Sequence, residues 1–431
     1  MTQRESYNYR KQLFHLAIPA MAENILQILM GITDSYLVAH LGLIAISSVS
    51  VANNIITVYQ AIFIALGSAV SSLVAKYCKQ RYYTKKLQLQ ADSLVLTFLI
   101  SLILGLLSIF GGRFFLTTLG TTKEVSQLGW LYLSVVGGGI FSLGLLTTLG
   151  AIHRAQDRPR IPMYVSVLTN VLNAVLSALA ITVFDFGLVG IALSTVLSRL
   201  VGVIILANML DLMPILKYVR WSISKTLVTM TLPIAGERLM MRIGDVAIIA
   251  IVVSFGVKVV AGNAIGETIT QFNYMPGMGM ATAVLILVAQ AFSEKDFDTI
   301  HKILRKSYIY SAMMMLFVGG CVYLLSPYLL SFFTNDLTAK KASILVALLS
   351  FLGEPATAGT LIFTALWQGL GKPKFPFYAT TIGMWGIRIF LGYVLGVLLS
   401  LGLAGVWLAT IADNLFRWVI LSWRYHVYQK R

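Results

Sequence analysis

The sequence predicts an all-α membrane protein of twelve transmembrane helices, built as two parallel six-helix repeats. Hydrophobic residues make up 58% of the 431 positions and charged residues only 12%, whereas a soluble domain carries about 25% charged residues. Twelve stretches are apolar over the length of about 20 residues that a bilayer span requires. The chain also aligns with itself at an offset of half its length. These observations indicate a duplicated helical protein in lipid.

The expected spans follow one another with short polar connections. In order, they are 12–39, 44–75, 88–110, 127–152, 161–183, 187–209, 224–254, 259–291, 303–330, 342–367, 375–400 and 403–423. Several exceed the length that a bilayer requires, so we expect them to tilt or to extend beyond it. The eighth contains "NYMPGMGMA", in which Pro276 removes an internal hydrogen bond. This predicts either a hinge or a static kink at that point.

The basic residues lie mostly on one side of the expected spans. With a cytoplasmic N-terminus, 23 of the 33 Lys and Arg residues fall in cytoplasmic segments and five on the opposite side. This bias predicts a multi-pass protein of the cell (plasma) membrane with both termini in the cytoplasm. The net charge of +16 therefore reflects topology. We expect a monomer in the lipid bilayer with no nucleic-acid partner.

A repeat relates the two halves of the chain. Shifting the sequence by 214 places Pro19 on Pro233 and Glu23 on Glu237. Because six spans is an even number, both copies enter the membrane in the same direction. The expected parts are an N-terminal lobe at 1–209, a cytoplasmic connector at 210–223 and a C-terminal lobe at 224–431. Duplicated bundles with a site at their interface are typical of alternating-access transporters, although duplication can also serve only as a scaffold.

Twelve charged residues lie inside the expected spans, where each costs about 2.5–3.5 kcal/mol at a helix centre. They are Arg199, Arg238, Arg242, Arg388, Arg417, Glu23, Asp34, Glu237, Asp245, Glu267, Glu354 and Asp413. Several are expected to neutralise one another as structural pairs. The expected pairs are Arg242 with Asp245 and Arg388 with Asp413. Arg417 lies near the cytoplasmic end of its span and is expected to extend its charge to the membrane surface.

Asp34, in "GITDSYLV", is the exception among these charges. No basic residue lies within four positions of it, and the surrounding segment is apolar enough for lipid. An intramembrane carboxylate without a local partner indicates a functional site. Asp34 can take up a proton or a cation and release either when water reaches it. Glu237 and Glu267 are weaker candidates for the same role.

Polar side chains in the spans recur at helical spacing, which predicts faces that line a site. In span 1, Glu23, Gln27 and Asp34 fall within an arc of about 40°. The other faces are Ser50, Asn53, Thr57 and Gln60 in span 2, Asn170, Asn173 and Ser177 in span 5, and Asn263, Glu267, Gln271 and Tyr274 in span 8. Such amides can alternatively serve only as hydrogen-bond partners between helices.

Other chemistry finds little support in the sequence. The segment "LWQGLGKP" lacks the first glycine of a phosphate-binding loop and continues into Pro373, so ATP hydrolysis by this chain is not expected. Cys78 falls in a loop and Cys321 in a span, so we expect no disulfide, and two thiols cannot complete a four-ligand zinc site. We therefore expect no cofactor and no enzyme activity, with an ion gradient as the energy source.

Four segments carry a resemblance to a known family. They are "LAIPAMAENILQILMGITDSYLVAHLG", its degenerate copy "MTLPIAGERLMMRIGDVAIIAIVVSFG", the loop pair "RPRIPMY" and "KPKFPFY", and "FGLVGIALSTVLSR". Together they resemble the multidrug and toxic compound extrusion (MATE) family over the whole chain. The resemblance implies two six-helix lobes in a V-shaped arrangement. It also implies export of amphiphilic, often cationic, small molecules in exchange for Na⁺ or H⁺.

The resemblance also implies an ion site in the N-terminal lobe. Asp34 matches the family's aspartate of span 1, Asn173 its asparagine of span 5, Thr195 its threonine of span 6 and Tyr132 its tyrosine of span 4. Many members have a second aspartate where this chain has Ser177. With one carboxylate, Na⁺ could bind at Asp34, Asn173 and Thr195, or Asp34 could be protonated alone.

Members that use the C-terminal lobe carry acids on spans 7 and 10, where Glu237 and Glu354 lie nearby but out of register. We therefore favour the N-terminal site. The secondary ion or substrate candidates are Glu23, Gln27, Asn53, Glu237, Glu267, Gln271 and Glu354.

Two other classes of function remain open. A flippase for lipids or lipid-linked precursors, from the same superfamily, would share the duplicated helices but should have a strongly cationic central cavity. A membrane-embedded enzyme would need a compact cluster of His, Asp or Cys, whereas the five His residues are dispersed.

Overall fold

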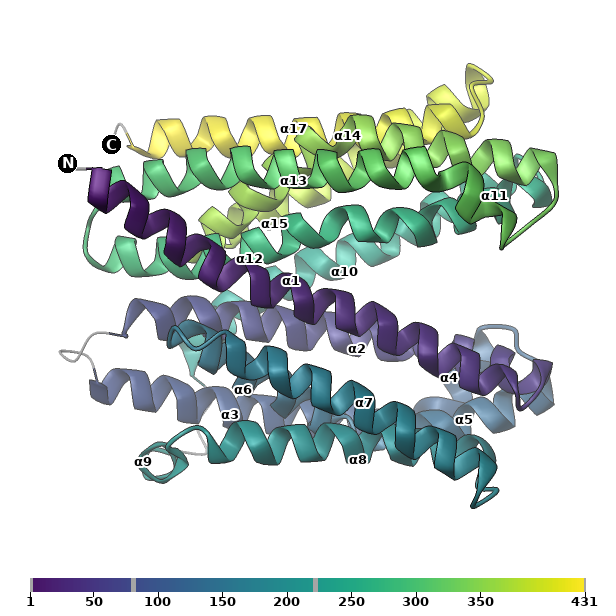
Figure 1. Cartoon of the computed structure of the whole chain (residues 1–431), viewed down its shortest axis with the longest axis horizontal. Helices are drawn as coiled ribbons and strands as arrows, with labels where there is room; N and C mark the ends of the chain where they lie inside the picture. Colours follow the sequence, from purple (N-terminus) through teal and green to yellow (C-terminus); the bar gives the residue numbers. More distant parts are fainter. Residues whose placement is uncertain (1–2, 79–82, 220–223, 430–431) are drawn as a thin grey trace. The chain divides into compact units, whose positions relative to one another are not determined.

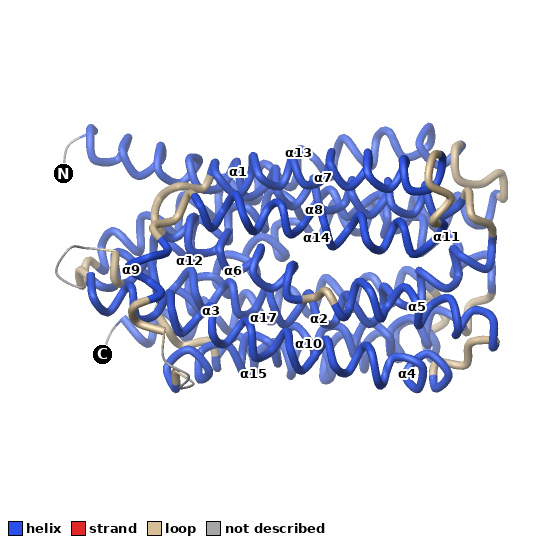
Figure 2. The backbone as a smooth tube through the Cα atoms, turned by 90° about the horizontal axis from the view of Figure 1, so that it is seen from below, coloured by secondary structure: helices blue, strands red, loops and turns tan. Residues whose placement is uncertain are grey.

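The protein is helical throughout the residues that its computed structural model describes, which are 3–78, 83–219 and 224–429. Within these ranges no strand is present (Figure 2). The predicted all-α fold class is therefore confirmed. Ten helices of the described chain are long and apolar enough to cross a membrane, and a bent pair of helices would provide an eleventh.

The chain forms two compact units. One consists of Ala22–Ala235, and the other combines Met1–Met21 with Gly236–Arg431. Two long helices, α1 (Gln3–Ala39) and α10 (Lys225–Val253), are therefore each divided between the units. These units are defined by which residues pack together, whereas the predicted lobes are defined by the sequence repeat. The two divisions describe different properties, so the boundaries of the lobes stay a prediction.

The unit of Ala22–Ala235 contains eight helices besides its parts of α1 and α10. They are α2 (Leu43–Lys76), α3 (Tyr83–Leu106), α4 (Gly112–Thr118), α5 (Lys123–Gly138), α6 (Phe141–Ala155), α7 (Arg160–Thr182), α8 (Gly187–Asn208) and α9 (Leu212–Leu216). Helices α7 and α8, in teal, pack side by side (Figure 1). A Cβ at Gly202 of α8 would lie 2.6 Å from the Thr169 side chain of α7. Small residues at such positions allow membrane helices to approach closely.

The second unit contains the remaining helices. They are α11 (Val257–Thr270), α12 (Met275–Ser293), α13 (Phe297–Ser331), α14 (Leu337–Gly369), α15 (Lys374–Ile382), α16 (Phe390–Tyr393) and α17 (Leu403–Gln429). Helix α14 packs against α11, α12, α13 and α17. Helix α1 begins and α17 ends at the same end of this unit (Figures 1 and 2).

Several predicted spans are interrupted. The fourth is broken into α5 and α6, which meet at a 40° bend, because the run of glycines at 137–139 has a poor helix propensity. The eighth contains a 3₁₀ segment at Gln271–Tyr274, so Pro276 begins the following helix. The third and eleventh contain π-helical turns at Leu107–Gly111, Gly383–Ile389 and Val394–Leu398.

Helix α10 is not among the ten apolar helices, although it covers the predicted seventh span. Its sequence contains the charged residues Glu237, Arg238, Arg242 and Asp245. These charges lower the hydropathy of the helix, so its place in a membrane depends on neutralisation by neighbouring groups. Its connection to α8 includes residues 220–223, which lie outside the described part of the chain.

Aspartates outside the spans begin two long helices. Asp296 accepts hydrogen bonds from the backbone N–H and the hydroxyl of Thr299 at the start of α13, and these bonds hold the pKa of Asp296 below its ordinary value. Asp336 accepts bonds from the backbone N–H groups of Thr338 and Ala339 at the start of α14. Both residues satisfy amides that a helix leaves unpaired at its N-terminus.

Gly262 provides a test of the packing between α11 and α14. A Cβ at this position would lie 2.5 Å from the backbone oxygen of Ala339, and the Gly262 carbonyl accepts a hydrogen bond of 2.7 Å from Ser343 Oγ. We expect Gly262→Leu to lower the free energy of unfolding by about 1–3 kcal/mol, because the helices must separate. Thermal unfolding in detergent measures this. Gly320→Ala, where the nearest atom lies 3.5 Å away, should change little; equal effects would contradict the packing argument.

Candidate functional site

Asp34 is hydrogen-bonded to one of the residues that the sequence assigned to its site. Asn173 Nδ2 on α7 donates a hydrogen bond of 2.7 Å to Asp34 Oδ1 on α1. Near it on α7, Asn170 Nδ2 donates to the backbone carbonyl of Leu26 at 2.9 Å. The polar face of α7 therefore lies against α1, and the amide of Asn173 fixes the position of the carboxylate.

Two oxygen atoms near this hydrogen bond are buried without a partner in the described chain. They are Asn173 Oδ1 and Ser177 Oγ, and the two side chains are only 1% and 0% exposed. Buried polar atoms without partners are uncommon and point to a bound water or ion. A carboxylate, an amide oxygen and a hydroxyl are also ligands that suit a hard cation. The set can therefore hold either a proton on Asp34 or a small cation.

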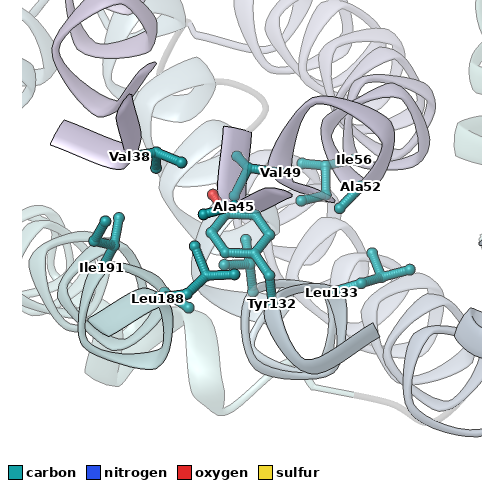
Figure 3. Close-up of a cluster of buried hydrophobic side chains, with 11 residues drawn as sticks. Val38, Ala45, Val49, Ala52, Ile56, Tyr132, Leu133, Leu188 and Ile191 are labelled. Carbon is teal, nitrogen blue, oxygen red and sulfur yellow. The ribbon is translucent and has the colours of Figure 1, made fainter. Parts of the chain in front are cut away.

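Thr195 and Tyr132 are buried, yet neither forms a hydrogen bond with Asp34 in the described structure. Thr195 Oγ1 donates to the backbone carbonyl of Ile191 at 3.0 Å, so its oxygen can still accept or coordinate. Tyr132 is 3% exposed and packs in an apolar cluster with Val38 and Ile191, as Figure 3 shows. The cluster connects α1, α2, α5 and α8 beside the carboxylate.

Sequence reasoning missed Arg199 as a neighbour of this site. It lies on α8 four residues after Thr195, so the two side chains share one face of the helix. The charge of Arg199 acts on both Asp34 and Tyr132, and its Nη1 atom is buried without a hydrogen-bond partner among the described residues. The spacing of threonine and arginine in "STVLSR" was the signal that could have identified it.

Glu23 is held in an ion pair. Arg154 Nη1 lies 2.6 Å from Glu23 Oε2, and the side chains are 16% and 13% exposed. Gln27 is exposed and Asn53 half-buried, and no hydrogen bond between described residues joins either of them to Asp34. The predicted lining face of span 1 is therefore not gathered into one cluster. The roles of these secondary candidates stay predictions.

Glu237, which the repeat relates to Glu23, has neutral hydrogen-bond partners. Thr380 Oγ1 donates to Glu237 Oε1 at 3.2 Å and Gln368 Nε2 to Oε2 at 3.4 Å. Gln368 follows Glu237 by 131 residues, the separation that also relates Arg154 to Glu23. One contact has thus been kept in both halves, as an ion pair in the first and as a neutral hydrogen bond in the second.

Glu354 belongs to a fully buried polar cluster in the second unit. Ser350 Oγ donates to Glu354 Oε1 at 3.2 Å, and Asn273 Nδ2 donates to Ser350 Oγ at 3.1 Å. Asn273 lies in the 3₁₀ segment that interrupts the eighth span. Glu354 Oε2 and Asn273 Oδ1 have no partner in the described chain. The cluster contains the same kinds of group as the surroundings of Asp34.

The predicted face of span 8 is divided. Asn263 is buried and donates to Glu267 Oε1 at 3.1 Å, while its own Oδ1 accepts a hydrogen bond of 3.0 Å from Trp407 Nε1. Glu267 and Gln271 are exposed. Asn263 therefore acts as a link between helices α11 and α17, as amides in membrane helices often do.

The expected charge pairs of the second unit are wrong. Asp245 Oδ1 lies 3.4 Å from Arg388 Nη1, while Arg242 is exposed. Asp413 is bound by Arg417 at 2.7 Å, and Arg417 is 4% exposed, so it does not extend to the membrane surface. The pair is four residues apart on α17, which places both groups on one face. The fully buried carboxylate of Asp413 therefore pairs with an arginine of its own helix.

The Glu23–Arg154 pair can be tested as a structural element. We expect Arg154→Met to lower the free energy of unfolding by about 3–5 kcal/mol, because it leaves a buried carboxylate without its partner. The double variant Glu23→Leu/Arg154→Met should recover most of this loss. Thermal unfolding of the purified protein measures both.

The exposed pair of Lys258 and Asp336, with side chains 68% and 33% exposed, is the matched control. Lys258→Met should leave the melting temperature unchanged. A double variant of the buried pair no more stable than Arg154→Met would contradict the structural role.

Comparison with known families and proteins gives consistent matches. A family model described as MatE matches residues 19–179 and 233–394, so it matches each half of the chain. The chain is 28% identical over 418 residues to the "Probable multidrug resistance protein NorM" of Thermotoga maritima, which covers 95% of this chain and 90% of that protein. It is 25% identical to the "Uncharacterized transporter YisQ" of Bacillus subtilis, with 96% and 94% covered.

Solved structures with the same fold include a crystal structure of MATE in the bent conformation. The match has a TM-score of 0.89 at 22% identity and covers 98% of this chain and 96% of that one. A MOP superfamily transporter from Pyrococcus furiosus, whose binding pocket is described as having reverse polarity, matches with a TM-score of 0.88 at 22% identity over 96% and 94%. At these identities the structures establish a shared fold.

Proposed function

Because this chain belongs to the MatE family, we propose that it is a cation-coupled multidrug efflux antiporter. It exports amphiphilic, often cationic, compounds by alternating access, in exchange for Na⁺ or H⁺. The observation that carries the proposal is the position of Asp34. Its carboxylate is half-buried, fixed by Asn173 and accompanied by the unpartnered buried oxygens of Asn173 and Ser177.

The chemistry of Asp34 suits reversible ion binding. Its hydrogen-bond donor is a neutral amide, so no hydrogen-bonded cation occupies the carboxylate permanently. A proton neutralises Asp34 directly, and Na⁺ would use the oxygens of Asp34, Asn173 and Thr195, with Ser177 in place of a second carboxylate. One elementary charge crossing about 150 mV supplies roughly 3.5 kcal/mol, enough for a concentration ratio of a few hundredfold.

The relatives' names support a transporter rather than an enzyme. Proteins named as probable multidrug resistance proteins align over most of this chain, and MATE structures of the same fold contain bound ligands. We propose that the protein acts as a monomer in the cell membrane with both termini in the cytoplasm. The coupling ion takes the place of a cofactor.

The flippase alternative requires a strongly cationic cavity for a phosphate headgroup. Two of the buried arginines, Arg154 at the end of α6 and Arg417 on α17, are engaged by acids, and Arg388 lies beside Asp245. The pairing of these three arginines leaves less positive charge for a phosphate headgroup and supports the antiporter, although Arg199 and Arg238 each have a buried nitrogen atom without a partner in the described chain. Purified protein in liposomes distinguishes the two functions: dye or drug uptake driven by separate Na⁺ and pH gradients supports the antiporter, whereas lipid translocation without a gradient supports the flippase.

Asp34→Asn tests the coupling site. The variant should fold and insert, because asparagine is nearly isosteric with aspartate, but gradient-driven drug transport should fall to background because it cannot take up the proton or cation. Transport in proteoliposomes measures this, with thermal unfolding as the check on folding. Tyr36→Phe, which alters an exposed side chain of the same helix, should retain transport. Full transport by Asp34→Asn would move the coupling role to Glu237, Glu267 or Glu354.

Ser177→Asp tests whether the unpartnered hydroxyl belongs to the ion site. A second carboxylate one turn after Asn173 should increase the attraction for a cation, so we expect a changed Na⁺ dependence of transport. The measurement is the transport rate as a function of Na⁺ at constant ionic strength. An unchanged dependence would show that the ion binds elsewhere. Thr182→Asp, at the exposed end of the same helix, controls for the added charge.

A further inference from the structure

Arg199 has no role in the mechanism described so far, although its guanidinium is close to the proposed ion site. It lies on α8, and its Nη1 atom is buried without a hydrogen-bond partner among the described residues. Arg199 as a whole is half-buried. A buried donor atom without a partner is costly, and arginines inside membrane spans usually face a functional site. This cost indicates that the Arg199 guanidinium forms an ion pair or a hydrogen bond at some stage of the transport cycle.

The register of the helices places Arg199 next to Asp34. Val38 on α1 and Ile191 on α8 belong to the same cluster of buried side chains (Figure 3). Helices α1 and α8 correspond to the first and sixth predicted spans, which run in opposite directions through the membrane. Asp34 lies one turn before Val38 on α1, and Thr195 lies one turn after Ile191 on α8. Both residues therefore lie on the same side of the cluster. Arg199 then lies one further turn along α8, which is about 5.4 Å.

The direction of the side chain reduces this separation. Side chains of an α-helix lean toward its N-terminus, which on α8 is the direction of Thr195 and therefore of Asp34. An arginine is long enough to cover one helical turn. Electrostatic coupling of Arg199 to Asp34 and to the Tyr132 hydroxyl agrees with this placement. On this register the Cα of Arg199 lies about one helical turn from the level of Asp34, and its side chain leans back toward that level.

We propose that Arg199 is the internal counter-ion of Asp34, which pairs with the carboxylate when the coupling ion leaves and is displaced when the ion binds. This inference rests on the proposed function. An ion-free carboxylate in the membrane would hinder the conformational change of the carrier because it is charged and poorly solvated. A tethered guanidinium neutralises it without a bound ion. The carrier can then reorient with neutral as well as cationic drugs.

The charged groups around the site are compatible with this assignment. Arg154, on α6, is already bound to Glu23 of α1 at 2.6 Å. Tyr132 of α5 packs in the neighbouring apolar cluster, and Asn173 and Ser177 of α7 are uncharged. Among the described residues, the cation whose charge acts on Asp34 is Arg199. The competition is therefore between Arg199 and the incoming Na⁺ or H⁺.

The experiment is ion titration of the full chain in detergent, followed by intrinsic tryptophan fluorescence. Na⁺ is varied against choline at constant ionic strength, and H⁺ is varied separately. In Arg199→Met, we expect the concentration of the coupling ion at half-response to fall at least tenfold, because the competitor is gone. Gradient-driven transport in liposomes should fall as well, because the ion is released too slowly. Arg199→Lys should retain most of the wild-type ion response, since it keeps the charge.

The control is Arg242→Met, which removes an exposed arginine of another span and should leave the titration unchanged. A merely structural role for Arg199 would lower the melting temperature but leave the half-response concentration unchanged, and that result would overturn the proposal. Asp34→Asn separates this failure from failure of the proposed function. If Asp34→Asn retains the ion response, the coupling site lies elsewhere; if it abolishes the response while Arg199→Met has no effect, only the counter-ion role is rejected.

Discussion

The hydrogen bond from Asn173 to Asp34 is the contact on which the proposed ion site depends. It fixes a carboxylate of α1 against α7 at 2.7 Å with an amide, which does not neutralise the charge. A guanidinium fixed permanently at that distance would stabilise the ionised carboxylate and oppose uptake of the coupling ion. An apolar neighbour would leave the acid permanently protonated. A neutral donor at hydrogen-bond distance holds the carboxylate in place and leaves its protonation or cation binding adjustable.

The two halves of the chain use equivalent positions for different purposes. Glu23 and Glu237 are related by the repeat, yet the first is bound by Arg154 and the second by the neutral side chains of Gln368 and Thr380. At the position equivalent to Asp34, the second half has Ile248. Duplication has therefore preserved the helix packing but not the carboxylate, and the buried acids of the second half, Glu237, Glu354 and Asp413, lie at other positions. The chemistry of each half must be read from its own residues.

The sequence was sufficient for the all-α class, because hydrophobic length and helical spacing are local properties. The association of Asp34 with Asn173 came only from the resemblance to the family, because spacing along one helix does not predict which helix lies against it. It was not sufficient for the charge pairs. Arg388 lies beside Asp245, and Arg417 binds Asp413, because partners of intramembrane charges are chosen by the packing of distant helices. A hinge or kink was expected at Pro276, whereas the helix is interrupted just before it, at Gln271–Tyr274. Pro276 itself lies in the first turn of the next helix, where a proline is tolerated. Arg199 was missed as a neighbour of the site because the spacing of residues along α8 does not show which residues of other helices lie near them.

Charge balance in the spans connects these observations. Glu23 and Asp413 have bound arginines, and Asp245 lies near one, so these acids contribute little net charge to the membrane interior. Asp34, Glu237 and Glu354 are hydrogen-bonded only by neutral groups in the described chain. A proton or a monovalent cation at any of these carboxylates therefore changes the net charge of a membrane-embedded site by a full unit. That change alters the free energy of desolvating the site, and it is the means by which an ion gradient can bias one conformation of a transporter over another.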